Sequence, residues 1–175
     1  MKLFSIAGIL IALALSGCTT MTPAPNLKTV PSVDLARYMG RWNVIAYTPN
    51  FLEDGKVGSA DTYLARPDGK MDNIYSFRKK TLDAPEKEWK GTAWVVNTQT
   101  NAEWRVRLLW PFTSEYLILE LDPSYQWAVV ASNGGKLVWV LARATSLSDQ
   151  TYAEILSTID QRGLKSSRLT KVPQP

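Results

Sequence analysis

The sequence predicts an all-β fold, an eight-stranded antiparallel up-and-down barrel with one C-terminal α-helix packed outside it. From Val33 onward, eight short segments alternate apolar and polar residues and are separated by clusters of turn-forming residues. One segment with helical spacing follows the last of them. Short connections favour antiparallel pairing, and sequential hairpins close most simply into a barrel, although a two-sheet sandwich would also satisfy the pattern.

The chain begins with a segment typical of a signal peptide, residues 1–17. Lys2 supplies positive charge, and an apolar run of roughly a dozen residues follows, which is short for a membrane span. The stretch Leu15-Ser16-Gly17-Cys18 resembles the lipobox of bacterial lipoproteins. That resemblance implies cleavage before Cys18, acylation of Cys18, and attachment to the bacterial outer membrane, which Thr19 favours over the inner membrane. The alternative is an ordinary secretory signal with a chance cysteine.

Composition limits what the rest of the chain can do. Residues 18–32 are rich in Thr and Pro and are predicted to be a lipidated tether, which leaves a single domain at residues 33–175. The formal charge is +4, but basic residues are spread among acidic ones, which argues against a nucleic-acid partner. With no histidine and a single cysteine, we expect no metal, no cofactor and no Ser-His or Cys-His catalysis.

The strands are predicted at residues 42–47, 59–65, 71–77, 90–96, 103–109, 116–121, 127–131 and 137–143. Turn-forming residues between them include 67–69, 97–101, 122–124 and 133–135. The helix is predicted at residues 149–162, capped by Ser146 or Ser148 and ended by Gly163. Its apolar face needs a surface to cover, and the barrel exterior supplies one. A membrane-surface helix is the weaker alternative, because the polar face is acidic.

Three motifs in order resemble the structurally defining regions of the lipocalins. They are Gly40-Arg41-Trp42, Asp122-Pro123-Ser124-Tyr125 and Arg143, and the residues flanking them are similar to bacterial lipocalins and apolipoprotein D. The resemblance covers residues 33–175, with two departures: Leu121 stands where threonine is usual, and Asn43 where an aromatic residue is common. It implies that Trp42 plugs the closed end of the barrel with Arg143 across its ring. Structural roles are therefore expected for Gly40, Trp42, Asp122, Tyr125 and Arg143, although Arg143 as an anchor for a ligand carboxylate is the alternative.

The resemblance and the two-residue repeat of strands together predict a ligand-binding wall inside the barrel. Met71 and Leu108 are expected to face inward with ten candidate ligand-binding residues: Tyr38, Tyr63, Tyr75, Phe77, Trp104, Val106, Tyr116, Ile118, Trp139 and Leu141. The alternative for all of them is a filled core. Glu120 points inward by the same alternation, unless a bulge turns it outward, and both possibilities stay open. Arg105 and Arg107 are expected outside.

These observations predict a lipid carrier and not an enzyme. An aromatic wall with few hydroxyl groups suits an elongated apolar ligand, and the family resemblance implies fatty acids or lysophospholipids, bound for storage, transport or membrane maintenance. The protein would be a monomer or a homodimer anchored in the outer membrane through Cys18. A lipid-modifying enzyme and a ligand-free envelope scaffold are the alternatives.

Overall fold

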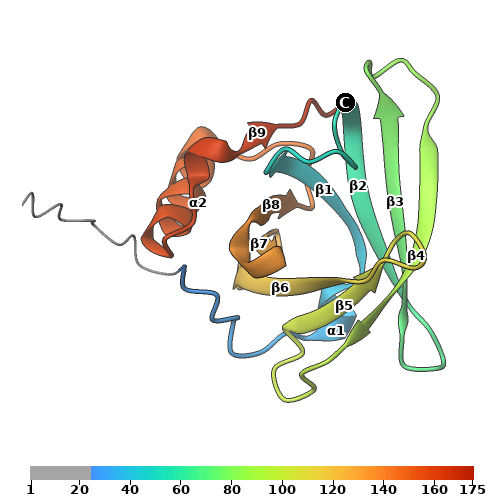
Figure 1. Cartoon of the computed structure of the whole chain (residues 1–175). Helices are drawn as coiled ribbons and strands as arrows, with labels where there is room; N and C mark the ends of the chain where they lie inside the picture. Colours follow the sequence, from blue (N-terminus) through green and yellow to red (C-terminus); the bar gives the residue numbers. More distant parts are fainter. Residues whose placement is uncertain (1–24) are drawn as a thin grey trace, which may run out of the picture.

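A computed structural model describes residues 25–175 of the chain. The predicted signal peptide, Cys18 and the beginning of the predicted tether lie outside the described residues. The eight predicted strands form one closed antiparallel barrel, because neighbouring strands pair in order and β1 also pairs with β2 (Figure 1). The strands are β1 (Gly40–Tyr47), β2 (Lys56–Ala65), β3 (Met71–Lys79), β4 (Lys87–Val95), β5 (Glu103–Arg107), β6 (Ser114–Leu121), β7 (Trp127–Ser132) and β8 (Leu137–Ala142). The all-β barrel prediction is confirmed.

The barrel has two ends, which the strand directions define. The connections β1–β2, β3–β4, β5–β6 and β7–β8 lie at one end, here called the open end. The short helix α1 (Leu35–Tyr38) lies at the other, closed end (Figure 1). Its last residue, Tyr38, is fully buried. No pattern in the sequence predicted α1. Its single turn is capped by Asp34, whose carboxylate accepts a hydrogen bond from the Arg37 N–H.

The helix α2 (Asp149–Gln161) packs outside the barrel, as predicted. Ser148 caps it by accepting a hydrogen bond from the Thr151 N–H, and Gly163 follows with a φ of 75°, a conformation that favours glycine. Ile155 and Ile159 are buried against outward-facing residues of β1 and β6–β8. After α2 come a 3-10 turn, η2 (Ser166–Arg168), and β9 (Thr170–Lys171), which pairs with β1 where β1 and β2 separate. β9 is too short for any sequence pattern to signal.

The apolar residues divide into two cores, one inside the barrel and one between the barrel and α2. In β8, for example, Leu141 belongs to the inner core, while Val138 and Val140 belong to the outer core. The strands away from α2 present polar residues to solvent instead, and Arg105 and Arg107 point outward as predicted. The alternation of the strands therefore carries through the whole barrel except at bulges.

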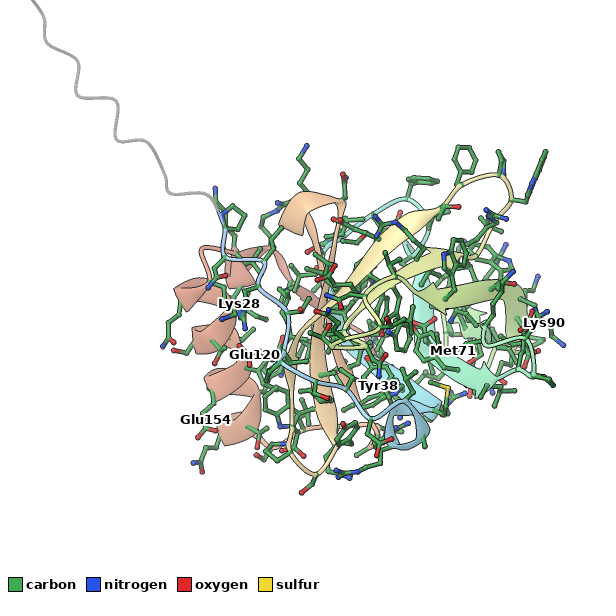
Figure 2. All side chains as sticks on the ribbon, turned by 90° about the horizontal axis from the view of Figure 1, so that it is seen from below. Lys28, Tyr38, Met71, Lys90, Glu120 and Glu154 are labelled. Atoms are coloured by element: carbon green, nitrogen blue, oxygen red, sulfur yellow. The ribbon has the colours of Figure 1, made fainter. Side chains whose placement is uncertain are left out.

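A bulge in β6 settles the position of Glu120. The pairing register shifts between Ile118 and Glu120, so Glu120 lies opposite Val129 of the outer core. Its carboxylate accepts a hydrogen bond of 2.8 Å from Arg162 Nε, on the side of the barrel that faces α2 (Figure 2). Of the two possibilities that the sequence left open, the outward one is correct.

The described residues of the predicted tether, 25–32, contact the rest of the domain. Asn26 N–H donates to the carbonyl oxygen of Arg162 at 2.6 Å, and Val30 N–H donates to that of Ile118 at 3.0 Å. Leu27 packs against the outer core and Val30 against the inner core. Proline excludes regular structure in this segment, but it does not prevent such isolated backbone hydrogen bonds. The described part of residues 18–32 therefore belongs to the folded domain.

Candidate functional site

The closed end of the barrel is built around Trp42. Its ring is fully buried, and the Arg143 guanidinium carbon lies 3.7 Å from the ring centroid, a stacked cation–π arrangement. Trp42 Nε1 donates to the carbonyl oxygen of Tyr38 at 2.8 Å. The guanidinium of Arg143 donates to four backbone carbonyl oxygens, those of Arg37, Tyr38, Arg41 and Tyr125. These bonds engage Arg143 in holding the closed end together, which does not suit the alternative role of a ligand anchor.

The other motif residues lie around this contact. Asp122 accepts hydrogen bonds from the backbone N–H groups of Ser124 and Gln126, and the Tyr125 hydroxyl accepts one of 2.8 Å from the Asp34 N–H. Gly40 has a φ of 94°, and a Cβ there would lie 3.4 Å from Arg143 Nη1, so a side chain would strain this position. Asn43, one of the two departures from the family pattern, is buried and donates 2.8 Å to the Arg143 carbonyl oxygen.

Four of the ten candidate ligand-binding residues fill the closed half of the interior. They are Tyr38, Tyr63, Trp104 and Tyr116. Neighbouring ring centroids among them lie 5.1 to 6.1 Å apart, and each residue is at most 9% exposed. The Tyr38 and Tyr116 hydroxyls are hydrogen bonded at 2.9 Å, and Trp104 Nε1 donates to the Asn101 carbonyl oxygen. Because these polar atoms have partners, this half of the barrel is a packed core in the structure.

The open half of the interior is lined differently. The other six candidates also belong to the inner core: Tyr75, Phe77, Val106, Ile118, Trp139 and Leu141, the last of which lies toward the closed end of β8. Val106 and Trp139 are only partly buried, as are Trp89 and Leu108 beside them. Accessible apolar surface of the interior therefore gathers toward the open end. Whether these residues bind a ligand stays a prediction.

Charged residues that the sequence analysis did not single out also lie in the interior. Glu53, on the β1–β2 connection, accepts a hydrogen bond of 2.7 Å from Trp139 Nε1, and burial raises the pKa of its carboxyl to about 7. Asp61 of β2 accepts a hydrogen bond of 2.9 Å from Asn73 Nδ2, and burial raises its pKa to about 6. Lys56 points its ammonium group at aromatic rings, and burial lowers its pKa to about 8.

These residues differ in how visible they are in the sequence. Asp61 lies two residues before Tyr63 in a predicted strand, so the alternation that placed Tyr63 inside could have placed Asp61 there too. Lys56 precedes the predicted strand and is separated from it by a bulge between Val57 and Ala60. Glu53 lies in the connection between β1 and β2, where side chains do not alternate between two faces and the sequence therefore gives no orientation.

Two surface depressions lie outside the barrel and not in its interior. One of about 270 Å³ is lined by Arg66, Lys70, Thr92, Trp94 and Arg107. The other, of about 160 Å³, lies between β1, β9 and α2 and is lined by Ile45, Thr145, Ser146, Leu147, Tyr152, Lys171 and Val172. Within residues 25–175, no three His, Cys, Asp or Glu side chains are grouped to hold a metal ion. In the same part of the chain, no helix is long and apolar enough to cross a membrane.

Comparison with known proteins decides the family. Residues 33–174 match the family model of the lipocalin-like domain. The chain belongs to the lipocalin-like family. This lipocalin is 28% identical over 173 residues to the outer membrane lipoprotein Blc of Escherichia coli K12, covering 97% of this chain and 96% of the relative. It is 27% identical over 163 residues to temperature-induced lipocalin-1 of Arabidopsis thaliana, covering 88% and 86%.

Solved structures support the fold of this lipocalin independently. Insecticyanin from the tobacco hornworm Manduca sexta superimposes with a TM-score of 0.69 at 16% identity, covering 87% of each chain. Lobster apocrustacyanin A1 gives a TM-score of 0.65 at 15% identity, covering 80% of this chain and 79% of that one. Identities this low establish the shared barrel and nothing about ligands.

Proposed function

We propose that this lipocalin is a membrane-anchored carrier that binds a fatty acid or a lysophospholipid in the open half of its barrel. The observation that carries the proposal is the accessible apolar wall of Trp89, Val106, Leu108 and Trp139 above a filled closed half. Such a wall binds a hydrocarbon chain through the area that it removes from water, at about 25 cal/mol for each Å². Polar groups are then needed only to orient the ligand.

The proposed anchor is the acylated Cys18, exposed by removal of residues 1–17. In its support, relatives that match almost the whole chain are named outer membrane lipoproteins, in Escherichia coli and in Vibrio cholerae. We therefore place the protein at the bacterial outer membrane. Several acyl chains on one residue give a stable attachment, whereas a single chain gives a marginal one.

The point at which the chain enters the barrel supports transfer of lipid between membrane and interior. A Cβ on Gly135, in the β7–β8 connection, would lie 3.5 Å from Pro25, so the first residue that the structure describes lies beside the open end. Cys18 and Pro25 are seven positions apart, a distance of at most about 25 Å along an extended chain. The anchor thus keeps the open end near the bilayer.

Exposed aromatic side chains at the open end fit this orientation. Phe51 of the β1–β2 connection is 89% exposed, and Trp110 and Phe112 of the β5–β6 connection are 83% and 76% exposed. Figure 2 shows the β5–β6 connection, in pale yellow, on the same upper side of the view as the β7–β8 connection. Rings of this kind favour the interface between lipid and water.

One observation favours a second candidate, a ligand-free envelope scaffold. Hydrogen-bonded aromatic residues fill the closed half of the barrel, and in a scaffold the side chains of the open half would also fill their space and leave no room for a ligand. An enzymatic role has no such support: the side-chain polar atoms of Tyr38, Trp42, Trp104 and Tyr116 in the closed half are engaged in structural hydrogen bonds.

A binding titration separates the carrier from the scaffold. We expect a long-chain fatty acid or lysophospholipid to change tryptophan fluorescence saturably, and Trp139→Ala to weaken binding by roughly 1 to 3 kcal/mol through lost contact area. Trp127, whose ring lies in the outer core, is the matched control, because Trp127→Ala should lower the melting temperature with little change in affinity. Equal affinity in all three proteins would exclude the proposed wall. Absence of saturable uptake by the wild type would exclude the carrier.

A further inference from the structure

Polar atoms without partners gather at the open end of the barrel interior. Among residues 25–175, four buried side-chain nitrogen or oxygen atoms have no hydrogen-bond partner: Glu53 Oε2, Lys56 Nζ, Tyr75 OH and Gln174 Oε1. The first three share one region, because Lys56 Nζ lies 5.0 Å from the centroid of the Tyr75 ring and Glu53 influences both groups electrostatically. Burying polar atoms unpaired is costly, so a cluster of them indicates a missing partner.

Lys56 is the most unusual member of this cluster. Its Nζ lies 3.4 Å from the ring centroid of Trp89, 4.0 Å from that of Phe77 and 5.0 Å from that of Tyr75. These rings stabilise the charge, but they accept none of the three hydrogen bonds that an ammonium group can donate. No acidic group lies within 4 Å of it in the described part of the chain. The cage therefore holds a desolvated cation whose donors are all free.

Tyr75 adds a second free donor. Its ring is buried in the inner core, and its hydroxyl lies near that of Ser59 but outside hydrogen-bond geometry. An ammonium group 5.0 Å from the centroid of a phenol ring, with both donors lacking acceptors, matches an anionic oxygen head that offers several acceptors. Apolar residues of the same inner core, Val106, Leu108 and Trp139, provide a surface for a chain attached to that head.

We infer that the open half of the barrel binds an amphiphile by its anionic head, a carboxylate or a phosphate, with Lys56 Nζ and Tyr75 OH as the donors. The inference rests on the proposed carrier function and names the head that the carrier selects. Glu53 Oε1 is held by Trp139 Nε1 and Asn50 Nδ2, whereas its Oε2 is one of the unpaired atoms. Because burial raises the pKa of this carboxyl to about 7, its neutral form can donate Oε2–H to an anionic head.

The test compares three ligands of equal chain length that differ only in the head: an alkyl carboxylate, an alkyl phosphate and an alkyl alcohol. The mature acylated protein, in a fixed concentration of non-ionic detergent, is titrated with each and followed by tryptophan fluorescence. Each ligand partitions into the detergent micelles to the same extent with every variant. The ratio of its affinities for two variants is therefore independent of this partition. We expect Lys56→Met to bind the carboxylate and the phosphate about tenfold to a hundredfold more weakly, the range for a charged hydrogen bond, and the alcohol almost unchanged.

Further variants exclude indirect effects. Tyr75→Phe, which keeps the ring and loses no hydrogen bond, should reduce anion affinity by a smaller factor, and Lys56→Arg should retain most of it. Lys79 is the matched control, because it pairs with Lys56 across the strands and is exposed, so Lys79→Met should leave all three affinities almost unchanged.

Three results would overturn the inference. An equal loss for the alcohol would mean that Lys56 supports the fold or the chain, and an unchanged anion affinity in Lys56→Met would mean that it does not contact the head. Tighter wild-type binding of an alkyltrimethylammonium ligand would mean that the rings serve a ligand cation and displace Lys56. The first two would leave the carrier function standing, whereas a wild type that binds none of these ligands would remove both.

Discussion

At the scale of single residues, the interior departs most from a simple apolar core at its carboxyl groups. Glu53 and Asp61 both have a pKa raised by burial, to about 7 and about 6. A carboxyl whose pKa is higher in the folded state binds more protons folded than unfolded, so folding is favoured at low pH. The free energy of unfolding should therefore fall as pH rises from about 4 to about 7.

Replacing Glu53 tests this directly. Glu53→Gln removes the titration and keeps an oxygen for Trp139 Nε1. At pH 8 we expect the free energy of unfolding to rise by about 1 to 3 kcal/mol, since one pKa unit corresponds to about 1.4 kcal/mol, and at pH 4 to be unchanged. Asp54→Asn, an exposed change on the same connection, serves as the control in urea unfolding at both pH values. A Glu53→Gln protein no more stable than wild type at pH 8 would contradict the burial of this carboxyl.

The strands and α2 could be predicted from the sequence, whereas the β6 bulge and the long-range contacts between elements could not. Residues such as Trp139 and Leu141 reveal their strand because side-chain alternation is local, and the spacing of Ile155 and Ile159 does the same for α2. The bulge beside Glu120, the pairing of β9 and the docking of Asn26 depend on partners far away in sequence. Local patterns cannot contain that information.

The same limit applies to the candidate site. Alternation, with the family resemblance for register, placed Tyr75, Val106 and Trp139 in the interior. It did not reveal the hydrogen bond between the Tyr38 and Tyr116 hydroxyls in the packed closed half, because that contact joins residues 78 positions apart. The inward orientation of Lys56 was not predicted, because the bulge in β2 interrupts the side-chain alternation between Lys56 and the rest of the strand.

Arg162 joins three elements and should be a stability determinant. It follows α2 and donates to the Glu120 carboxylate and to the carbonyl oxygens of Leu119 and Lys28. Arg162→Ala should lower the free energy of unfolding by about 2 to 4 kcal/mol, because it leaves a half-buried carboxylate and carbonyl groups without donors. Glu154→Ala, at an exposed position of α2, should change it by less than about 0.5 kcal/mol. Similar urea midpoints for the two variants would show that this junction contributes little.

The β5–β6 connection should contact the bilayer if the anchor holds the open end against it. In vesicles that contain brominated lipid, fluorescence quenching of the anchored protein should fall in Trp110→Phe, because Trp110 is the exposed tryptophan of that connection. Trp94→Phe, on the outer wall of β4, should leave the quenching unchanged. Quenching that persists in Trp110→Phe would place this connection away from lipid.

Considered as a whole, the molecule divides its barrel between two tasks. The closed half is a packed aromatic core locked by Trp42 and Arg143, and it provides rigidity. The open half combines accessible apolar residues with a caged ammonium group, and the first described residue, Pro25, lies at the same end. These features fit the proposed lipid carrier.

Photo-crosslinking shows whether a lipid chain occupies the open half of the barrel. A fatty acid with a diazirine in its chain is irradiated with the protein, and the labelled peptides are identified by mass spectrometry. We expect label on the inward-facing residues of β5 and β8, at and near Val106 and Trp139, and its loss when excess unlabelled fatty acid is added. Label confined to outward-facing residues such as Trp94 and Trp127, or label that excess fatty acid does not remove, would contradict it.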